Sequence, residues 1–186
     1  MRSKAHRRST RALILIDFVN PCDFPHDGGF ASRAISAARR TRRLKRILKS
    51  RGVPVVYAND NFGGWTRDFG ELVRICEARR SPAGELVQCL APESDDYRVL
   101  KPRNSAFFGT PLEFLLEELG ATTLIMAGIA TDNCVLFSAS DAYVRKFRVL
   151  VPRDCVVSLR DQDRKRALDH MRRVLKADVR SSLGQR

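Results

Sequence analysis

The sequence predicts an α/β protein in which helices cover a parallel β-sheet. Short apolar runs alternate along the chain with longer segments of helical periodicity, which is typical of parallel strands joined by crossover helices. Several apolar runs are rich in Val, Ile and Leu without polar alternation, as expected of strands buried on both faces. The 186 residues fit one domain and contain no repeat or low-complexity linker. We therefore expect a single domain over residues 1–186, with a basic N-terminal arm at residues 1–11.

Six segments fit the strand pattern. Most are short apolar runs bounded by turn residues or by a polar residue at the carboxyl end, and the last one is the weakest match. In chain order the expected strands are Ala12–Asp17, Val53–Asn59, Tyr97–Lys101, Thr123–Gly128, Arg148–Val151 and Ala177–Ser181.

Four longer segments have helical spacing. In the first, small and apolar residues recur every three or four positions and arginines occupy the opposite face, which indicates a solvated outer surface on a core-packed helix. Gly52 and Gly120 stand where helix C-caps favour glycine. One or two further short helices are expected within Trp65–Leu90. The four expected helices are Ser32–Ser50, Thr110–Leu119, Thr131–Lys146 and Asp161–Leu175.

The net charge of +13 raises the question of a nucleic-acid partner. The sequence lacks the aromatic interleaving of single-strand binders and the signatures of the common nucleic-acid modules. We therefore expect no specific nucleic-acid partner, and any binding should be weak and steeply salt-dependent.

The composition also bears on where the protein is located and on whether it binds a metal. No apolar run approaches the ~20 residues needed to span a bilayer, and the run at residues 12–16 is too short for a signal-peptide core. The sequence therefore predicts a cytoplasmic protein without membrane contact. Five cysteines without a C-x-x-C pair and three scattered histidines fit neither a disulfide framework nor a zinc site.

Three chemically distinct side chains fall at the carboxyl ends of expected strands. Asp17 ends the first strand, Lys101 ends the third, and Cys134 opens the helix after the fourth. In open parallel sheets ligands bind at this edge, so the three side chains should gather there. Taken one at a time, each also has a structural explanation: a turn acid, a solvated strand-end lysine and a packed core cysteine.

Together the three side chains make an activated nucleophile. With Thr131 as N-cap, Cys134 would lie in the first helical turn, where the helix dipole and Lys101 should lower the pKa of the thiol. Asp17 could accept the thiol proton and return it to a leaving amine.

Three motifs resemble those of the isochorismatase-like cysteine hydrolases, and they follow in that family's order. Residues 13–20 (LILIDFVN), followed by Asp23-Phe24-Pro25, resemble the opening motif. Residues 101–107 (KPRNSAF) resemble the lysine motif K-x-x-x-S-A-F, and residues 128–135 (GIATDNCV) resemble the nucleophile motif. The likeness runs from about residue 12 to residue 154.

The resemblance implies a Rossmann-like, three-layer αβα fold with a six-stranded parallel sheet. It also implies a catalytic triad of Asp17, Lys101 and Cys134, acting through a thioester without a cofactor. The Ile129–Ala130 peptide would be cis, and the N–H groups of Ala130 and Cys134 would form the oxyanion hole. The family further suggests a homodimer or homotetramer and a small-molecule substrate with an amide, carbamoyl or ureido C–N bond.

Departures from the family pattern narrow this expectation. Val19 replaces a glutamine that many members carry. Phe62 replaces the histidine of the metal-binding Asp-x-His segment of nicotinamidases, so we expect no metal and no nicotinamidase activity. Cys134 argues against isochorismate cleavage, since the enzymes that catalyse it lack this nucleophile.

The substrate pocket is expected to be apolar with a few placed polar groups. Phe24, Trp65 and Phe107 are candidates for its wall, although core packing is an equal alternative for both phenylalanines. Arg103 could bind a substrate carboxylate. Two other functions stay open at this point: an idle family member that binds nucleic acid or anions, and a redox sensor that uses Cys134.

Overall fold

The protein has a six-stranded parallel sheet flanked by helices, which confirms the predicted fold class. The structure is a computed structural model and describes residues 8–24, 28–79 and 82–182. The path of the sheet runs β3-β2-β1-β4-β5, and β6 also pairs with β4. The strands are β1 (Arg11–Ile16), β2 (Val55–Asp60), β3 (Tyr97–Lys101), β4 (Thr123–Ile129), β5 (Arg148–Leu150) and β6 (Val156–Val157).

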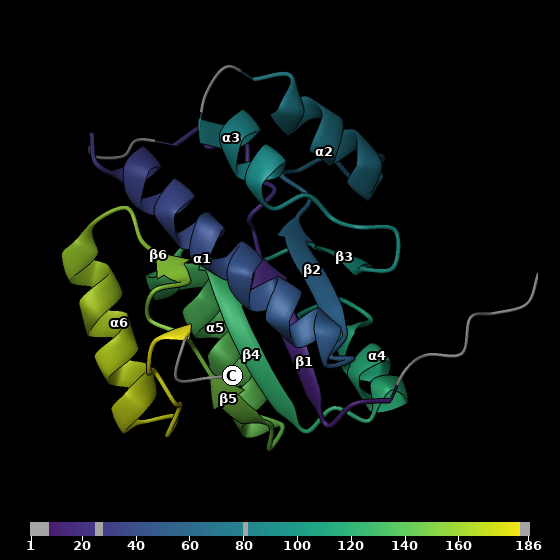
Figure 1. The fold of residues 1–186 in the computed structure, drawn as a ribbon, viewed down its shortest axis with the longest axis vertical. Coiled ribbons are helices and arrows are strands. Elements are labelled where there is room, and N and C mark those ends of the chain that lie inside the picture. The colour runs from purple at the N-terminus through teal and green to yellow at the C-terminus, as the bar shows by residue number, and fades with distance from the viewer. Residues whose placement is uncertain (1–7, 25–27, 80–81, 183–186) are drawn as a thin grey trace, which may run out of the picture.

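Helices cover both faces of the sheet (Figure 1). One apolar core joins the sheet to α1, α2 and α3, and a second core on the other face joins it to α4, α5 and α6. The chain order reverses between β1 and β4, and in such sheets a ligand crevice lies beyond the carboxyl ends of the strands at this switch point. The helices are α1 (Phe30–Ser50), α2 (Phe69–Glu77), α3 (Pro82–Cys89), α4 (Leu112–Leu119), α5 (Leu136–Val144) and α6 (Asp161–Arg173), with a π-helical turn, η1, at Thr131–Val135.

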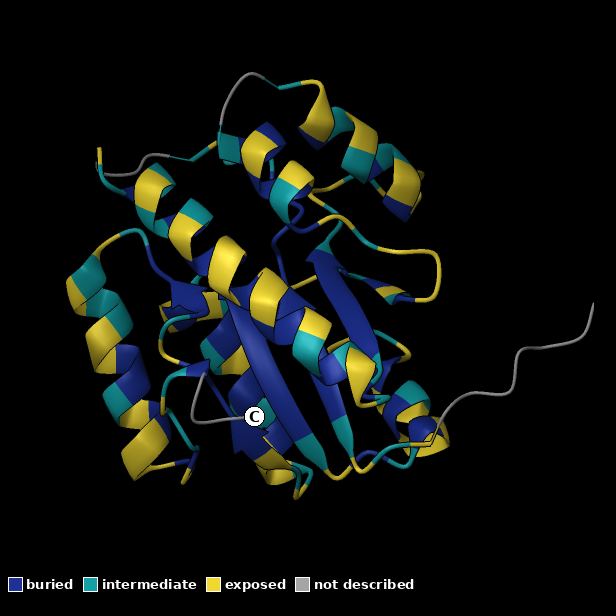
Figure 2. Cartoon of the chain, in the orientation of Figure 1, coloured by how far each residue is buried: buried dark blue, intermediate teal, exposed yellow. Residues whose placement is uncertain are grey.

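The two central strands are buried almost completely (Figure 2). Residues 12–16 and 124–127 have no measurable exposure, because neighbouring strands and helices on both faces cover them. At Gly128 an added Cβ would lie 2.2 Å from the carbonyl oxygen of Ile16. Only glycine therefore permits β1 and β4 to approach so closely at the edge where the site forms.

α1 carries its arginines on the exposed face and its small and apolar residues on the sheet, as its sequence pattern predicts (Figure 2). Among the described residues, no helix is both long and apolar enough to cross a membrane.

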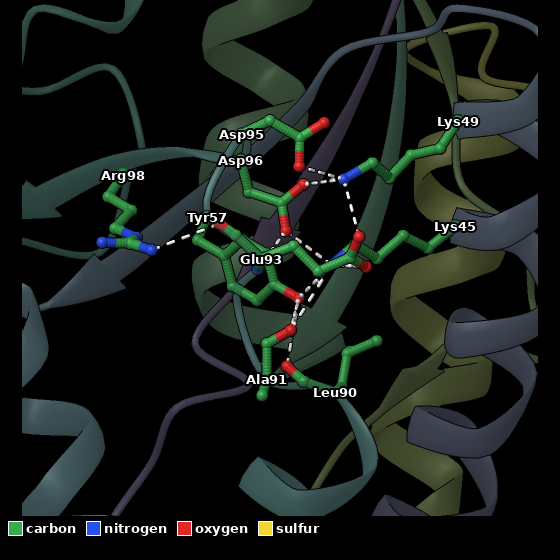
Figure 3. Close-up of polar contacts among 9 residues, drawn as sticks. All are labelled: Lys45, Lys49, Tyr57, Leu90, Ala91, Glu93, Asp95, Asp96 and Arg98. Carbon is green, nitrogen blue, oxygen red and sulfur yellow. Dashed lines mark hydrogen bonds and ion pairs between the residues drawn. The ribbon is translucent and has the colours of Figure 1, made fainter.

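A buried ion-pair network anchors α1 to the loop before β3 (Figure 3). Lys45, almost fully buried, donates to Asp96 at 2.5 Å and to the hydroxyl of Tyr57 at 3.1 Å. Lys49 lies 3.0 Å from the other oxygen of Asp96 and 2.7 Å from Asp95. A buried charge is tolerated only when it is paired and hydrogen-bonded, and this network provides both. It holds the start of β3, and Lys101 is at the end of that strand.

The sixth strand differs from the prediction. Ala177–Ser181 forms only an isolated bridge between Asp178 and Leu150, and the sixth strand is instead β6, Val156–Val157. Two residues are too short for a strand pattern to be visible in sequence, so the pairing partner in β4 decides their conformation.

Two further expectations need correction. The segment expected as one helix, Thr131–Lys146, is divided into η1 and α5. Of the expected N-terminal arm, residues 1–7 lie outside the described residues, and Arg11 is the first residue of β1, paired with Thr123.

Candidate active site

Asp17, Lys101 and Cys134 converge at the carboxyl edge of the sheet. Asp17 follows β1, Lys101 is the last residue of β3, and Cys134 lies in η1 directly after β4. Asp17 adopts a φ of 52°, a left-handed conformation that is uncommon for residues other than glycine. Such conformations cluster at functional sites, where the surrounding structure enforces them.

The ammonium group of Lys101 is the centre of the arrangement. It lies 2.9 Å from Asp17 Oδ2, 3.6 Å from Cys134 Sγ and 3.5 Å from Asp60 Oδ2. It also donates to the carbonyl oxygen of Arg103 at 3.2 Å. The side chain of Lys101 is fully buried. Burial alone would lower its pKa, but the interactions with Asp17, and in smaller part with Cys134, outweigh this effect and raise the pKa.

The carboxylate of Asp17 is held from two sides. Its Oδ2 faces Lys101, and its Oδ1 accepts a hydrogen bond of 2.6 Å from the backbone N–H of Asp60. Burial raises the pKa of Asp17 above its ordinary value, while Lys101 and the interaction with Cys134 oppose the rise. A carboxylate with a raised pKa is a stronger base than an exposed one, which suits proton transfer.

The thiol of Cys134 differs from the sequence-based expectation of a lowered pKa. Burial and the negative charge of Asp17 raise the pKa of Cys134 to about 12, although Lys101 acts in the opposite direction. Cys134 lies in a π-helical turn, and Thr131 does not act as a side-chain N-cap. The hydroxyl of Thr131 is buried and has no hydrogen-bond partner among the described residues. The resting thiol is therefore protonated at neutral pH, and it needs a base to become a nucleophile.

The turn between β4 and η1 has the peptide geometry that the resemblance implies. The Ile129–Ala130 bond is cis. The carbonyl oxygen of Ala130 accepts hydrogen bonds from the N–H groups of Asn133 and Val135, both at 3.1 Å. These bonds hold the turn on either side of Cys134.

The lysine motif is bonded directly to the nucleophile helix. The hydroxyl of Ser138 donates to the carbonyl oxygen of Cys134 at 2.6 Å and accepts from the N–H of Ala106 at 2.9 Å. Ser105 bonds to Asp141 on α5. Ser138 was not among the residues singled out from the sequence, and its position four residues after Cys134 is the only signal that could have suggested it.

Asp60 is a further member of the site. It is the last residue of β2, at the same edge of the sheet, but the sequence did not indicate its contact with Lys101. Its Oδ1 accepts from the N–H of Phe62 at 2.7 Å, so both carboxylate oxygens have partners.

A cavity of about 520 Å³ shares two residues with the surroundings of the Lys101 ammonium. Asp60 and Arg103, which both contact Lys101, form part of its wall, while none of Asp17, Lys101 and Cys134 lines it. Trp65 is 79% exposed and lies at its rim. The cavity is lined by Asp60, Asn61, Gly63, Trp65, Pro102, Arg103, Asn104 and Phe108.

Phe24 and Phe107, which were expected in the wall of the substrate pocket, do not line this cavity. Phe107 is buried and packs against Phe147, with the guanidinium of Arg145 over its ring. Phe24 packs edge-on against Phe30 at the margin of the core. Core packing therefore accounts for both side chains, and the aromatic residue that follows Phe107, the exposed Phe108, lines the cavity instead.

The described part of the chain contains no group of three or more His, Cys, Asp and Glu side chains that could hold a metal ion. At the position where nicotinamidases bind metal, Asp60 is already bonded to Lys101 and the N–H of Phe62, and the phenyl ring of Phe62 provides no ligand. The described residues at this position therefore do not fit a metal.

Proteins that are similar to this chain in sequence include a member of the isochorismatase family and an amidohydrolase. The "uncharacterized isochorismatase family protein YaaI" of Bacillus subtilis is 34% identical over 172 residues, which cover 92% of this chain and 94% of the relative. The maleamate amidohydrolase of Pseudomonas putida is 29% identical over 153 residues, covering 78% and 71%.

A solved structure of an amidase has a similar fold. The crystal structure of N-carbamoylsarcosine amidase from Thermoplasma acidophilum superimposes with a TM-score of 0.70 and 28% identity, over 94% of this chain and 97% of that one. Residues 11–182 match the isochorismatase domain family. Because this match covers almost the whole chain, the protein belongs to the isochorismatase family and is an isochorismatase-like hydrolase.

Proposed function

We propose that the protein hydrolyses the C–N bond of a small amide, carbamoyl or ureido compound, with Cys134 as nucleophile. The observation that carries the proposal is the position of the Lys101 ammonium, 2.9 Å from the Asp17 carboxylate and 3.6 Å from the Cys134 sulfur. A base, a cation and a thiol in mutual contact form the unit that nucleophilic catalysis requires.

The proposed reaction has two halves. In the first, Asp17 takes the thiol proton, the sulfur of Cys134 attacks the carbonyl carbon, and Asp17 returns the proton to the leaving nitrogen as the C–N bond breaks. In the second, Asp17 takes a proton from a water molecule as its oxygen attacks the thioester carbon, the C–S bond breaks, and Asp17 returns the proton to the sulfur, which releases the acid and restores the thiol. The N–H groups of Ala130 and Cys134 are proposed to receive the negative oxygen in both steps.

The raised pKa of Cys134 fits this sequence of steps better than a permanently ionised thiolate does. A thiol with a pKa of about 12 is almost entirely protonated at neutral pH, so attack depends on proton transfer to Asp17.

A screen of small primary amides, carbamoyl and ureido compounds for ammonia release would test the proposal, with the Cys134→Ala variant as the blank. We expect release from at least one class, no release by the variant, and a Cys134-linked acyl adduct in mass spectra of the wild-type protein quenched with acid. Turnover that survives in Cys134→Ala would contradict the proposed nucleophile.

Arg103 is proposed to select substrates that carry a carboxylate. Its side chain is exposed, lies in the cavity wall, and its own carbonyl oxygen bonds to Lys101. Arg103→Gln should raise the KM of a carboxylate-bearing amide about tenfold and change kcat little, because one charge-assisted contact is lost in ground state and transition state alike. The same substitution should leave the KM of a neutral amide unchanged, and an equal effect on both substrates would refute the assignment.

We further predict that turnover requires no metal. Incubation with a chelator, followed by elemental analysis and an activity assay, should leave the rate unchanged. A stoichiometric metal whose removal abolishes activity would overturn this prediction.

A further inference from the structure

A second cavity lies away from the three catalytic candidates. It has a volume of about 450 Å³, and its lining residues come from α1, β6, α6 and the loop before β6. Figure 1 shows where α1, β6 and α6 lie in the fold. None of Asp17, Lys101 and Cys134 lines it. Four arginines and two aspartates contribute to its wall: Arg33, Arg40, Arg153, Arg164, Asp154 and Asp161.

The two aspartates are engaged by other groups of the protein. Asp154 accepts hydrogen bonds from the N–H and the hydroxyl of Ser182, at 2.7 and 2.8 Å. Asp161 binds Arg164 at 2.7 Å and Lys165 at 3.0 Å. Arg40 approaches Asp154 only to 3.8 Å. The carboxylates therefore leave the charges of Arg40 and Arg153 incompletely neutralised.

Arg153 is the side chain of this wall that is best placed to bind an anion. Its side chain is exposed and its guanidinium makes no hydrogen bond or ion pair with any of the residues that the structure describes. Its backbone is held in place, because its carbonyl oxygen accepts from Arg164 at 3.0 Å and its N–H donates to Arg180 at 3.2 Å. Arg40, which reaches Asp154 only at 3.8 Å, is a second arginine of this wall whose charge is weakly compensated.

We propose that this cavity binds the phosphate group of a small organic phosphate. A phosphate dianion can accept charge-assisted hydrogen bonds from Arg153 and Arg40 together, because it offers several oxygens in a tetrahedral arrangement. The guanidinium groups come from three segments, α1, the loop before β6, and α6, and so approach from different directions. A carboxylate has two oxygens in one plane, which suits a single guanidinium fork better than an encircling set.

The site lies beside the strand that borders the nucleophile turn. β6 pairs with β4 in register Val157 to Ile129, and the next residue, Ala130, precedes η1. A bound phosphate would link α1 to α6 across this strand, and because it binds only the folded protein it should raise Tm.

Titration calorimetry with inorganic pyrophosphate and with adenosine 5′-monophosphate tests the proposal, independently of any catalytic assay. We expect one saturable site per chain in wild type, and Arg153→Gln should weaken binding about tenfold, the loss of one charge-assisted contact. Since the guanidinium of Arg153 has no partner within the described protein, this substitution breaks no internal ion pair. Arg40→Gln should weaken binding as well.

Arg166→Gln serves as the matched control, because Arg166 is a largely exposed arginine on α6 outside the cavity wall. It should change the affinity by less than about twofold. The proposal fails if wild type shows no saturable binding up to about 10 mM ligand, or if Arg153→Gln and Arg166→Gln have equal effects. It also fails if citrate binds and both phosphates do not. The proposal fails as well if the protein binds single-stranded RNA but neither phosphate compound, and Arg153→Gln leaves the RNA binding unchanged. The nucleic acid would then be bound by another basic surface of the protein.

Discussion

Replacing Asp17 with Asn is expected to lower kcat for amide hydrolysis by about 10²- to 10⁴-fold, the usual contribution of a positioned acid–base group. Asparagine can neither accept the proton of Cys134 nor return one to the leaving nitrogen. The same substitution removes the negative charge that raises the pKa of the thiol, so this pKa should fall below about 12. Loss of turnover should therefore accompany faster alkylation of Cys134 at a given pH.

Rates of alkylation by iodoacetamide between about pH 7 and 10, beside steady-state kinetics, measure both effects. Asp60→Asn is the matched control, because Asp60 also contacts Lys101, at 3.5 Å, but receives no proton in the proposed reaction. Its loss of kcat should be much smaller. If Asp60→Asn abolishes turnover and Asp17→Asn does not, the base has been assigned to the wrong carboxylate.

Replacing Lys101 with Met should act on both partners of the lysine. Lys101 lowers the pKa of Cys134 and that of Asp17, so both pKa values should rise when its charge is removed. Alkylation at neutral pH should slow about tenfold for each unit by which the thiol pKa rises. Asp17 would remain protonated to higher pH, so the acid limb of the kcat profile should move upward and turnover at neutral pH should fall.

Lys165→Met is the control for the loss of a lysine, since Lys165 is exposed on α6 and pairs only with Asp161 among the described residues. It should leave the alkylation profile and turnover unchanged. If Lys101→Met leaves both the alkylation profile and turnover unchanged, the proposed triad is wrong. Cys134 would then be a packed core cysteine without a catalytic role. Circular dichroism of the variant must first show a folded protein, because removing one partner of a buried ion pair is destabilising by about 3–5 kcal/mol.

The fold class could be predicted because its evidence is local. The apolar runs of β1 and β4 and the amphipathic pattern of α1 reflect burial on two faces and on one face, respectively. Helix boundaries were less accurate, and α6 ends at Arg173 although its apolar spacing continues to Leu175. Fraying and capping at a helix end depend on tertiary neighbours as well as on the sequence.

The gathering of Asp17, Lys101 and Cys134 could also be predicted, from their places at strand ends and from the three motifs that carry the family resemblance. Membership of the isochorismatase family is confirmed. The catalytic roles stay predictions, which the Asp17 and Lys101 variants would test.

The sequence by itself determined the parallel sheet, the face of α1 that is buried, and the edge at which the three side chains meet, because each depends on the order and periodicity of neighbouring residues. Only the tertiary structure decided the direction of the Cys134 pKa shift, the contact of Asp60 with Lys101, the pairing of β6 and the arginine-lined cavity. The pKa of a thiol depends on how deeply it is buried and on charges within a few ångströms. These distances join residues that lie tens of positions apart in the chain, and no local pattern specifies them.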